Sequence, residues 1–240
     1  MLISRRDVLK LAASAPAAVG FGAAAAALLA GSAEAAPLGI LLDYAAGVLP
    51  AEQIRAAGAV GAIRYVSDRR PGADWMLGKP MQPDEARDLQ QNGLKIVSCY
   101  QFGKQATADW LGGQAAGVEH AQRGLQLHTA AGGPDSAPIY ASIDDNPSYE
   151  QYQAQVAPYL RGWESVIGHQ RTGVYANAKT IEWAVQDGLG SCFWQHNWGS
   201  PGGVAHPAAN LHQVEIDKRK VGNVGVDINE ILTPAFGQWA

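Results

Sequence analysis

Three aspartates stand at the ends of short β-type runs and could do acid–base chemistry together. They are Asp43 after LGILL, Asp144 after PIYASI and Asp227 within VGVDIN. When carboxylates are buried side by side, desolvation and like charge both favour protonation of at least one of them. Hydrolysis of a glycosidic bond needs one protonated and one ionised carboxyl flanking that bond. The three acids therefore predict a site for this chemistry, and a structural ion network is the alternative.

Two adjacent acids stand in YASIDDNP, residues 140–147, and strand parity separates them. Alternate residues of a strand share a face, so Tyr140, Ser142 and Asp144 lie on one side and Asp145 on the other. The side that carries Asp145 is otherwise apolar and suits a helix-covered face. We therefore predict that Asp144 faces the site and that Asp145 belongs to the loop or the start of the next helix.

Further polar and aromatic side chains are expected at the same strand ends. The same parity places Tyr100 and Gln195 inward and turns Cys99 and Cys192 outward, beneath helices, so no disulfide between the cysteines is expected. Polar side chains can hydrogen-bond a sugar and aromatic rings can stack on it, although packing in the core is the alternative for each aromatic residue. The predicted substrate-binding residues are Arg64, Tyr100, Tyr175, Gln195 and Glu215.

The elements that must position these residues alternate along the chain. Strands are predicted at Leu38–Tyr44, Ala59–Ser67, Leu94–Phe102, Ala137–Asp144, Thr172–Ala176, Cys192–Trp198, Leu211–Ile216 and Val224–Asn229. Helices are predicted at Pro50–Ala57, Asp84–Asn92, Ala106–Ala130, Ser148–Ile167 and Lys179–Gln186.

Five strand–helix units followed by three strands predict one α/β domain over residues 36–240, a TIM-barrel-like (β/α)5β3 barrel. The first and last strands of a closed barrel are neighbours, so Asp43 and Asp227 should approach one another. The last strands lack crossover helices and could run antiparallel. An open doubly wound sheet is the alternative, but LLDYAAG is not the glycine-rich phosphate turn that usually follows its first strand.

Residues 1–35 have the features of a twin-arginine export signal. Arg5-Arg6 open a basic segment, an Ala/Gly/Leu run follows to Ala30, and small residues around Ala35 mark a cleavage point. We predict export by the twin-arginine translocase, removal of residues 1–35 and a mature protein in the periplasm, the cell wall or the medium. A membrane anchor is the alternative, but the apolar run falls short of the roughly 20 residues that a span needs.

The composition argues against several other classes of function. The chain has a net charge of −4, which argues against a nucleic-acid partner. No basic cluster suggests binding to an anionic membrane either. The two cysteines and six histidines show neither CxxC nor HExxH spacing, so no metal or other cofactor is expected. The expected partner of the mature protein is a carbohydrate.

The chain resembles, over nearly its full length, twin-arginine-exported mycobacterial proteins with a glycoside hydrolase-like domain. The segments AAGAVGAIRYVSDR, YASIDDNPSYEQY and FWQHNW carry this resemblance. The order of motifs is also similar, more distantly, to the Chalaropsis-type lysozymes of glycoside hydrolase family 25, whose barrel has five βα units followed by three strands. The resemblance implies an exported protein that acts on a cell-envelope glycan, peptidoglycan or another wall polysaccharide.

Site residues carry over from those lysozymes motif by motif. Asp43 matches their first aspartate, and Val226–Asn229 matches their final Val-Asp-Leu-Asn strand. Gln213 is the one residue kept from their Trp-Gln-Tyr strand, which implies that it binds substrate. Ser142-Ile143-Asp144 stands in the place of Asp-x-Glu, which makes Asp144 the counterpart of the catalytic glutamate and leaves Ser142 where a second carboxylate would be.

Two hypotheses follow from this pattern. In the first, the protein is a glycoside hydrolase in which Asp144 is the general acid, and Asp227 and Asp43 position water or stabilise positive charge at the sugar. In the second, it is a non-catalytic glycan-binding or cell-wall regulatory protein on the same barrel, because Ser142 replaces a carboxylate and Asp144 is one methylene shorter than glutamate.

Overall fold

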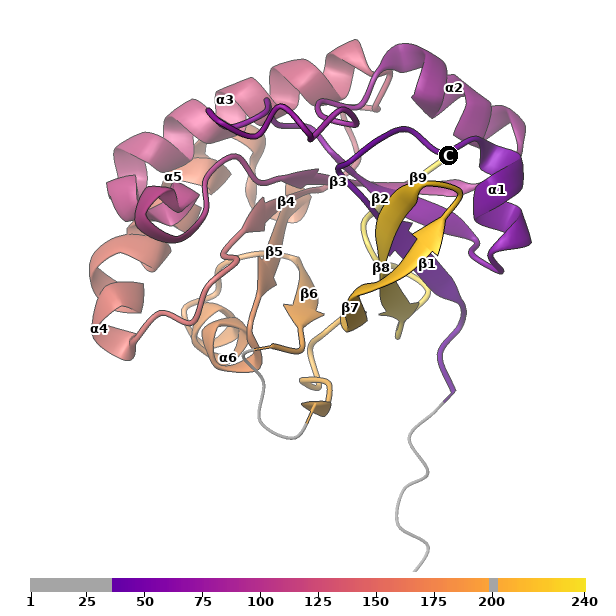
Figure 1. Ribbon diagram of the computed structural model, residues 1–240. Coiled ribbons are helices and arrows are strands. Elements are labelled where there is room, and N and C mark those ends of the chain that lie inside the picture. The colour runs from indigo at the N-terminus through magenta and orange to yellow at the C-terminus, as the bar shows by residue number, and fades with distance from the viewer. Residues whose placement is uncertain (1–35, 199–202) are drawn as a thin grey trace, which may run out of the picture. The chain divides into compact units, whose positions relative to one another are not determined.

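The computed structural model describes residues 36–198 and 203–240 (Figure 1). The unit described below is Pro37–Ala240. The predicted export signal lies outside the described residues. Within the described ranges, no helix is long and apolar enough to cross a membrane.

Eight strands and five helical regions follow in the predicted order, with one short strand added at the end. The strands are β1 (Ile40–Asp43), β2 (Gly61–Tyr65), β3 (Lys95–Tyr100), β4 (Ile139–Ser142), β5 (Thr172–Ala176), β6 (Cys192–His196), β7 (Leu211–Val221), β8 (Val224–Ile231) and β9 (Gln238–Trp239). The α-helices are α1 (Ala51–Ala56), α2 (Pro83–Gln91), α3 (Gly113–Ala130), α4 (Tyr149–Gln151), α5 (Ala157–Ile167) and α6 (Ala178–Gln186). Short 3₁₀ turns lie at η2 (Gln105–Thr107), η3 (Asp109–Gly112) and η5 (His169–Arg171), and a π-helical turn, η4 (Tyr152–Val156), joins α4 to α5.

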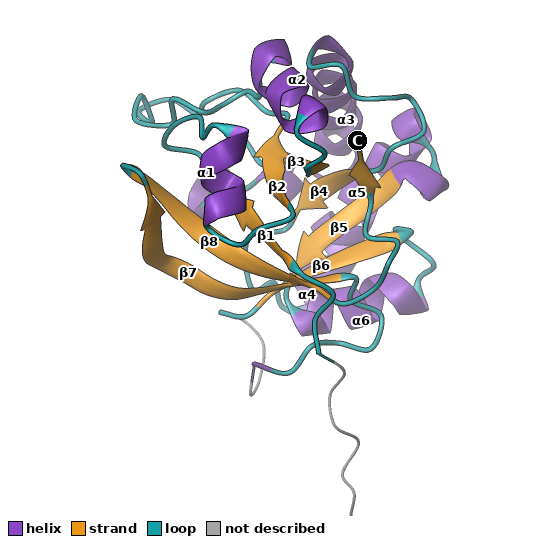
Figure 2. Cartoon of the chain, turned by 90° about the vertical axis from the view of Figure 1, so that its right-hand side faces the viewer, coloured by secondary structure: helices purple, strands orange, loops and turns teal. Residues whose placement is uncertain are grey.

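The eight main strands close into a barrel, as predicted. The sheet runs β2-β1-β8-β7-β6-β5-β4-β3, and β2 also pairs with β3, which closes the ring. Strands β1 to β7 are all parallel to one another, whereas β8 is antiparallel to both of its neighbours, β7 and β1. The β7–β8 hairpin is the longest strand pair and extends beyond the rest of the sheet (Figure 2). Strand β9, which was not predicted, pairs antiparallel with β3.

Helices cover the outside of the barrel, where α3 and α5 pack closely on one another (Figure 1). Gly117 of α3 and Gly162 of α5 permit this approach. An added Cβ at Gly117 would lie 2.0 Å from the Tyr159 carbonyl oxygen, and one at Gly162 would lie 2.2 Å from that of Gln114. Any larger side chain at these two positions would therefore force the helices apart.

The predicted helix Ala106–Ala130 begins later than its composition suggests, at Gly113. The Asp109 side chain accepts hydrogen bonds from the backbone amides of Phe102 and Gly103, at 2.8 and 2.7 Å. These bonds hold the segment in two 3₁₀ turns, and Gly113 takes a φ of 56°, outside the helical range. By contrast, the capping box predicted from Ser148 and Gln151 forms as expected.

The barrel interior is a separate apolar cluster, and it corrects the predicted orientation of two strands. Its members include Cys99, Tyr140, Tyr175, Cys192 and Trp194. The parity prediction is therefore right for β4, where Tyr140 faces inward, and wrong for β3 and β6, where the cysteines face inward. Both faces of a strand in a helix-covered barrel are buried, so side-chain polarity is a weak guide to which face is inside. Both cysteines are free.

Candidate active site

Asp43 and Asp227 form a cross-strand pair at one end of the barrel. They are direct partners in the antiparallel β1–β8 ladder, which places their side chains next to one another on the same face. The Gln213 side-chain amide donates to both carboxylates, at 3.2 Å each. Asp43 also accepts from the Asn229 amide at 2.8 Å and from the Tyr65 hydroxyl at 3.0 Å. The pair predicted from strand order is thus present and held by hydrogen bonds.

The environment of this pair favours a shared proton near neutral pH. Burial raises the pKa of Asp43, although hydrogen bonds from Asn229, Tyr65 and Gln213 oppose the rise. Burial, and next the charge of Asp43, raise the pKa of Asp227 to about 7. Two interacting carboxyls of this kind titrate as a unit. The pair can therefore hold one proton while it still carries a negative charge.

Asp144 follows β4 and lies at the same end of the barrel. The Gln101 side-chain amide donates to its carboxylate at 2.7 Å, and the Trp198 side chain makes a second hydrogen bond to it. Burial raises the pKa of Asp144, and the charge of Lys104 is the largest opposing effect. The charge of Asp144 in turn helps to raise the pKa of Asp227. Asp227 is therefore close enough to feel the charges of both Asp43 and Asp144.

Tyr175 connects this set to the aromatic lining of the barrel. Its hydroxyl donates to the Gln213 side-chain carbonyl at 2.9 Å, which turns the Gln213 amide group toward the two acids. Burial raises the pKa of the Tyr175 hydroxyl, and the charges of Asp144, Asp43 and Asp227 raise it further. The Tyr175 ring lies 4.0 Å from that of Trp194, measured between centroids. Tyr175 and Gln213 thus lie among the acids, as the sequence predicts.

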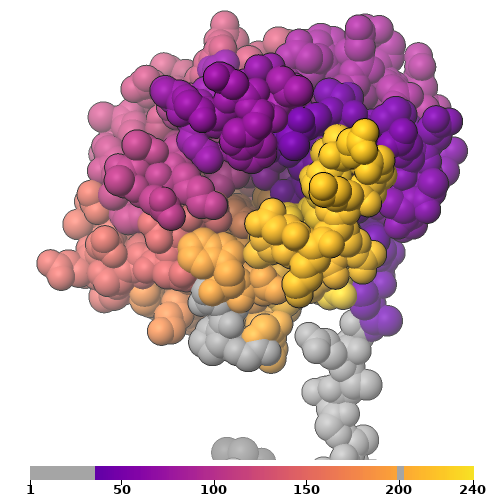
Figure 3. Space-filling model, in the orientation of Figure 1, coloured from indigo at the N-terminus to yellow at the C-terminus, as the bar shows by residue number. Residues whose placement is uncertain are grey.

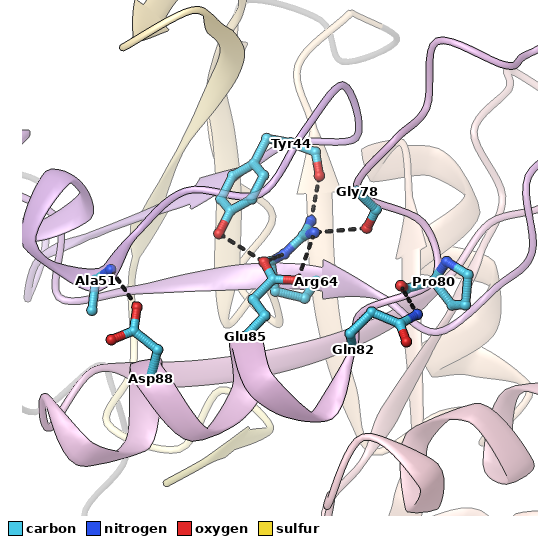
Figure 4. Close-up of polar contacts among 8 residues, drawn as sticks. All are labelled: Tyr44, Ala51, Arg64, Gly78, Pro80, Gln82, Glu85 and Asp88. Atoms are coloured by element: carbon cyan, nitrogen blue, oxygen red, sulfur yellow. Dashed lines mark hydrogen bonds and ion pairs between the residues drawn. The ribbon is translucent and has the colours of Figure 1, made fainter.

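Arg64 does not lie at this site, which corrects the sequence prediction. Neighbouring Tyr65 faces Asp43, so Arg64 points to the opposite, outer side of β2. It is fully buried there, ion-paired with Glu85 of α2 at 2.6 Å, and it donates to the Tyr44 and Gly78 carbonyl oxygens (Figure 4). Its guanidinium also lies 3.9 Å from the centre of the Tyr44 ring. These contacts give Arg64 a structural role.

Tyr100 lies on the outer side of β3, away from the predicted position. Its ring packs against His120 of α3 and Trp163 of α5, with centroid distances of 5.1 and 5.5 Å. A cavity of about 520 Å³ lies on this outer side, lined by Tyr100, Phe102, His120 and Arg123 among others. Tyr100 therefore supports helix packing beneath that cavity and does not reach the acids.

Gln195 and Glu215 are also turned away from the acid cluster. The Gln195 side chain donates to the Val204 carbonyl oxygen at 2.9 Å and accepts from the His206 amide at 2.7 Å, which holds the loop after β6. Glu215 pairs with Arg219 at 2.5 Å on the β7–β8 hairpin. Parity explains Gln195, because the inward positions of β6 belong to Trp194 and His196.

His196 and Trp198 hold Asp144 from the side of β6, although neither was predicted to do so. Burial lowers the pKa of His196 to about 3, so the ring is neutral, and it hydrogen-bonds the backbone of Ile143 and Asp145 on either side of Asp144. Trp198 stacks on His196, with ring centroids 4.3 Å apart and planes 9° apart. Asp145 itself remains in the loop, as predicted, where it accepts from the amide of Asn146.

Ser142 keeps the position that the motif comparison gave it. It is buried, with 2% of its surface exposed, on the inward face of β4. Its hydroxyl has no hydrogen-bond partner among the residues that the structure describes. A small polar group therefore stands where the lysozyme-like motif has a carboxylate.

Lys79 also supports the site, and the sequence did not predict it, because a residue in a loop carries no periodic signal. Its side chain is buried, donates to the Gln101 carbonyl oxygen at 2.7 Å and lies 3.9 Å from the centre of the Tyr65 ring. The Gln101 and Tyr65 side chains bond Asp144 and Asp43 respectively. Lys79 thus supports both halves of the acid cluster from behind.

For the carboxyl-catalysed hydrolysis that this acid cluster could perform, we expect Lys79→Met to lower the rate about tenfold, because misplacing a supporting group by a fraction of an ångström weakens every step that depends on it. The Michaelis constant should change little, since Lys79 is buried behind the cluster. Steady-state kinetics of Lys79→Met and of Lys95→Met, an exposed lysine at the start of β3, would check this. Equal rates for the two variants would contradict a positioning role.

The raised carboxyl pKa values predict that stability falls as pH rises. The pKa of Asp227 is about 7 in the folded protein against an ordinary value of 3.8, so folding favours the protonated form. This stabilisation is complete below about pH 4 and is lost as pH rises through about 7. We expect a fall in the free energy of unfolding of about 2 kcal/mol from this group, which allows for its partial exposure. Urea unfolding of the wild type and of Asp227→Asn across this range would show a flatter profile in the variant, and equal slopes would refute the assignment.

Comparisons with known proteins identify the family of the chain. A family model described as "Rv2525c-like, glycoside hydrolase-like domain" matches residues 52–231. The chain is 76% identical, over all 240 residues and the full length of both proteins, to the Mycobacterium tuberculosis protein named "Putative peptidoglycan hydrolase Rv2525c".

Solved structures show the same fold. The crystal structure of the Tat-secreted M. tuberculosis protein Rv2525c in complex with L-tartrate is 81% identical, covers 85% of this chain and 100% of its own, and has a TM-score of 0.84. The CTP1L endolysin shares the fold at 15% identity and a TM-score of 0.53, over 81% of this chain and 66% of its own. The chain therefore belongs to the Rv2525c-like family of glycoside hydrolase-like domains.

Proposed function

We propose that this protein hydrolyses O-glycosidic bonds of a cell-envelope glycan, with peptidoglycan as the first candidate. The observation that carries the proposal is the Asp43–Asp227 pair, whose carboxylates share the Gln213 amide and in which burial and the charge of Asp43 raise the pKa of Asp227 to about 7. With Asp144 at the same end of the barrel, the raised pKa values allow one carboxyl to be protonated while another is ionised, as glycoside hydrolysis requires.

In this proposal Asp144 is the general acid. Burial raises its pKa, which favours the protonated form, and this carboxyl gives its proton to the glycosidic oxygen when the bond of that oxygen to the anomeric carbon breaks. An attacking water adds to that carbon and gives its proton to the ionised carboxylate of the Asp43–Asp227 pair. The same negative charge stabilises the positive charge that develops at the sugar.

The names of relatives support the substrate class. The M. tuberculosis relative is named as a peptidoglycan hydrolase, and its crystal structure is described as that of a Tat-secreted protein. Together with Arg5-Arg6 and the small residues before Ala36, this supports export of the present chain by the twin-arginine translocase. Export would bring the barrel to the envelope, where its proposed substrate lies.

A glycan-binding protein without efficient catalysis is the second candidate, and Ser142 favours it. The Ser142 hydroxyl is buried without a partner at the position of a second carboxylate, and Asp144 reaches less far than a glutamate. Such a protein would keep the cleft and the sugar contacts and lose most of the rate.

The test is release of new reducing ends from purified envelope glycans, peptidoglycan included, by the wild-type protein. Mass spectrometry of the fragments would identify the cleaved bond. Reducing-end release supports the hydrolase. Absence of release, together with retained binding of the same glycans, would replace it by the binding function.

A further inference from the structure

The β7–β8 hairpin carries three consecutive basic residues in a chain whose net charge is −4. Lys218, Arg219 and Lys220 are consecutive and exposed. Arg219 is neutralised by its ion pair with Glu215. Neither lysine pairs with an acidic side chain within residues 36–198 and 203–240. The hairpin therefore presents two ammonium groups to solvent that form no ion pair within the described residues, next to the exposed Asp217 carboxylate, and Figure 3 shows it in yellow at the surface.

The hairpin is fixed against the acid pair by a bulge. Glu215 pairs with Ile228 and Arg219 with Val226, so three residues of β7 stand opposite Asp227 alone. Within the bulge Asp217 takes a φ of 55°, and its backbone amide donates to the Asp227 carboxylate at 2.8 Å. The two lysines that follow are thus attached directly to the support of a proposed catalytic residue.

Register places Lys220 on the face of the acids. Lys220 is the cross-strand partner of Gly225, and Gly225, Asp227 and Asn229 alternate along one face of β8. Asn229 bonds Asp43, which identifies this face as that of the cleft. Lys218 lies within the bulge, directly after Asp217, whose amide bonds Asp227.

Gly225 adds an independent observation. A Cβ built at this position would meet no atom within 4 Å, and the backbone there is not left-handed. Neither packing nor backbone geometry therefore requires glycine. Its missing side chain leaves open space beside Lys220 on the face of the cleft, which a ligand group could occupy.

We propose that this cationic strip, defined as Lys218, Lys220 and the open position at Gly225, binds carboxylate groups carried on the glycan whose sugars occupy the acid cleft. The inference rests on the proposed function and narrows its substrate to carboxylate-bearing strands. Three acids in the cleft repel such a strand, and the strip supplies the compensating attraction. Peptidoglycan carries carboxylates along its length on its lactyl-peptide substituents, and a flexible ammonium group suits such solvated groups.

The test compares two forms of one probe, soluble peptidoglycan strands with free carboxylates and the same strands after their carboxyls are converted to neutral amides. Binding is measured by calorimetry on the Asp144→Asn protein, so that cleavage does not consume the probe. In that background, Lys218→Gln with Lys220→Gln should weaken binding of the free-carboxylate strands about fivefold at low salt, and by less than about twofold at roughly 0.5 M salt. Binding of the amidated strands should not change.

Two further variants keep the result specific. Lys95→Gln with Arg87→Gln removes the same charge from the start of β3 and the exposed side of α2, and should leave binding unchanged. Gly225→Val should weaken binding of both strand forms without lowering the unfolding temperature, because only the open space is filled. Equal binding of free and amidated strands by the Asp144→Asn protein, or no effect of the lysine changes, would overturn the strip while leaving the hydrolase proposal intact. Failure of both strand forms to bind, with no reducing-end release by the wild type, would remove the glycan function itself.

Discussion

Replacing Asp144 with asparagine is expected to lower the rate of reducing-end release about a thousandfold, within the usual range for loss of a general acid. The side-chain amide keeps the shape of Asp144 and its place beside Gln101 and Trp198, but it has no proton to give to the leaving group. Binding of the glycan should persist, because the other groups of the cleft are intact. Kinetics with a purified glycan, together with calorimetric binding, would measure both effects.

Asp145→Asn is the matched control for this change. Asp145 is the adjacent acid at the same strand end, it lies in the loop, and its carboxylate bonds the backbone of Asn146. Its replacement should leave the rate within about twofold of the wild type, as expected for a charge outside the acid cluster. Comparable losses in both variants would mean that the negative charge of the strand end matters and that Asp144 has no special role as an acid.

A comparably large effect, on stability, is expected from Arg64→Met. The side chains of Arg64 and Glu85 are 0% and 2% exposed, so removing the guanidinium leaves a buried carboxylate without its partner. Breaking a buried pair in this way costs about 3–5 kcal/mol. Urea unfolding should therefore show a much lower midpoint, while the folded fraction of Arg64→Met keeps the glycan affinity of the wild type.

Two further variants test whether the unpaired buried charge causes the loss of stability. Arg87→Met breaks the pair of Arg87 with Asp84, whose side chains are 60% and 91% exposed, and should cost less than about 1 kcal/mol. Arg64→Met combined with Glu85→Leu removes both buried charges and should recover much of the lost stability. Normal stability of Arg64→Met with weakened glycan binding would restore the substrate-binding role that the sequence suggested.

In these proposals, the three acids and the cationic strip recognise different parts of the glycan. The acids Asp43, Asp144 and Asp227 act on the sugar ring, whereas the cationic strip acts on groups that the ring carries. Because the Asp217 amide bonds Asp227, a change in the hairpin also acts on the acid pair. Variants of the strip should therefore be tested for the pH dependence of cleavage as well as for affinity, since loss of this hydrogen bond would raise the pKa of Asp227 further.

The sequence by itself determined the order of elements, the closed barrel and the neighbours β1 and β8. These follow from local signals, namely the alternation of apolar runs and the caps of the helices, together with the rule that consecutive units close the ring. Once the barrel is known, Asp43 and Asp227 must meet, because each lies on a strand whose neighbour is fixed. The inward direction of Asp144 also followed, since its strand has one polar face.

Only the tertiary structure decided which face of β2, β3 and β6 looks inward. Each of these strands is buried on both sides, and a buried polar residue such as Arg64 is equally compatible with either side until its partner Glu85 is placed. The sequence could not predict that Lys79 and His196 support the site, for a related reason. Their contacts join residues far apart in the chain, and no local pattern encodes a contact of that kind.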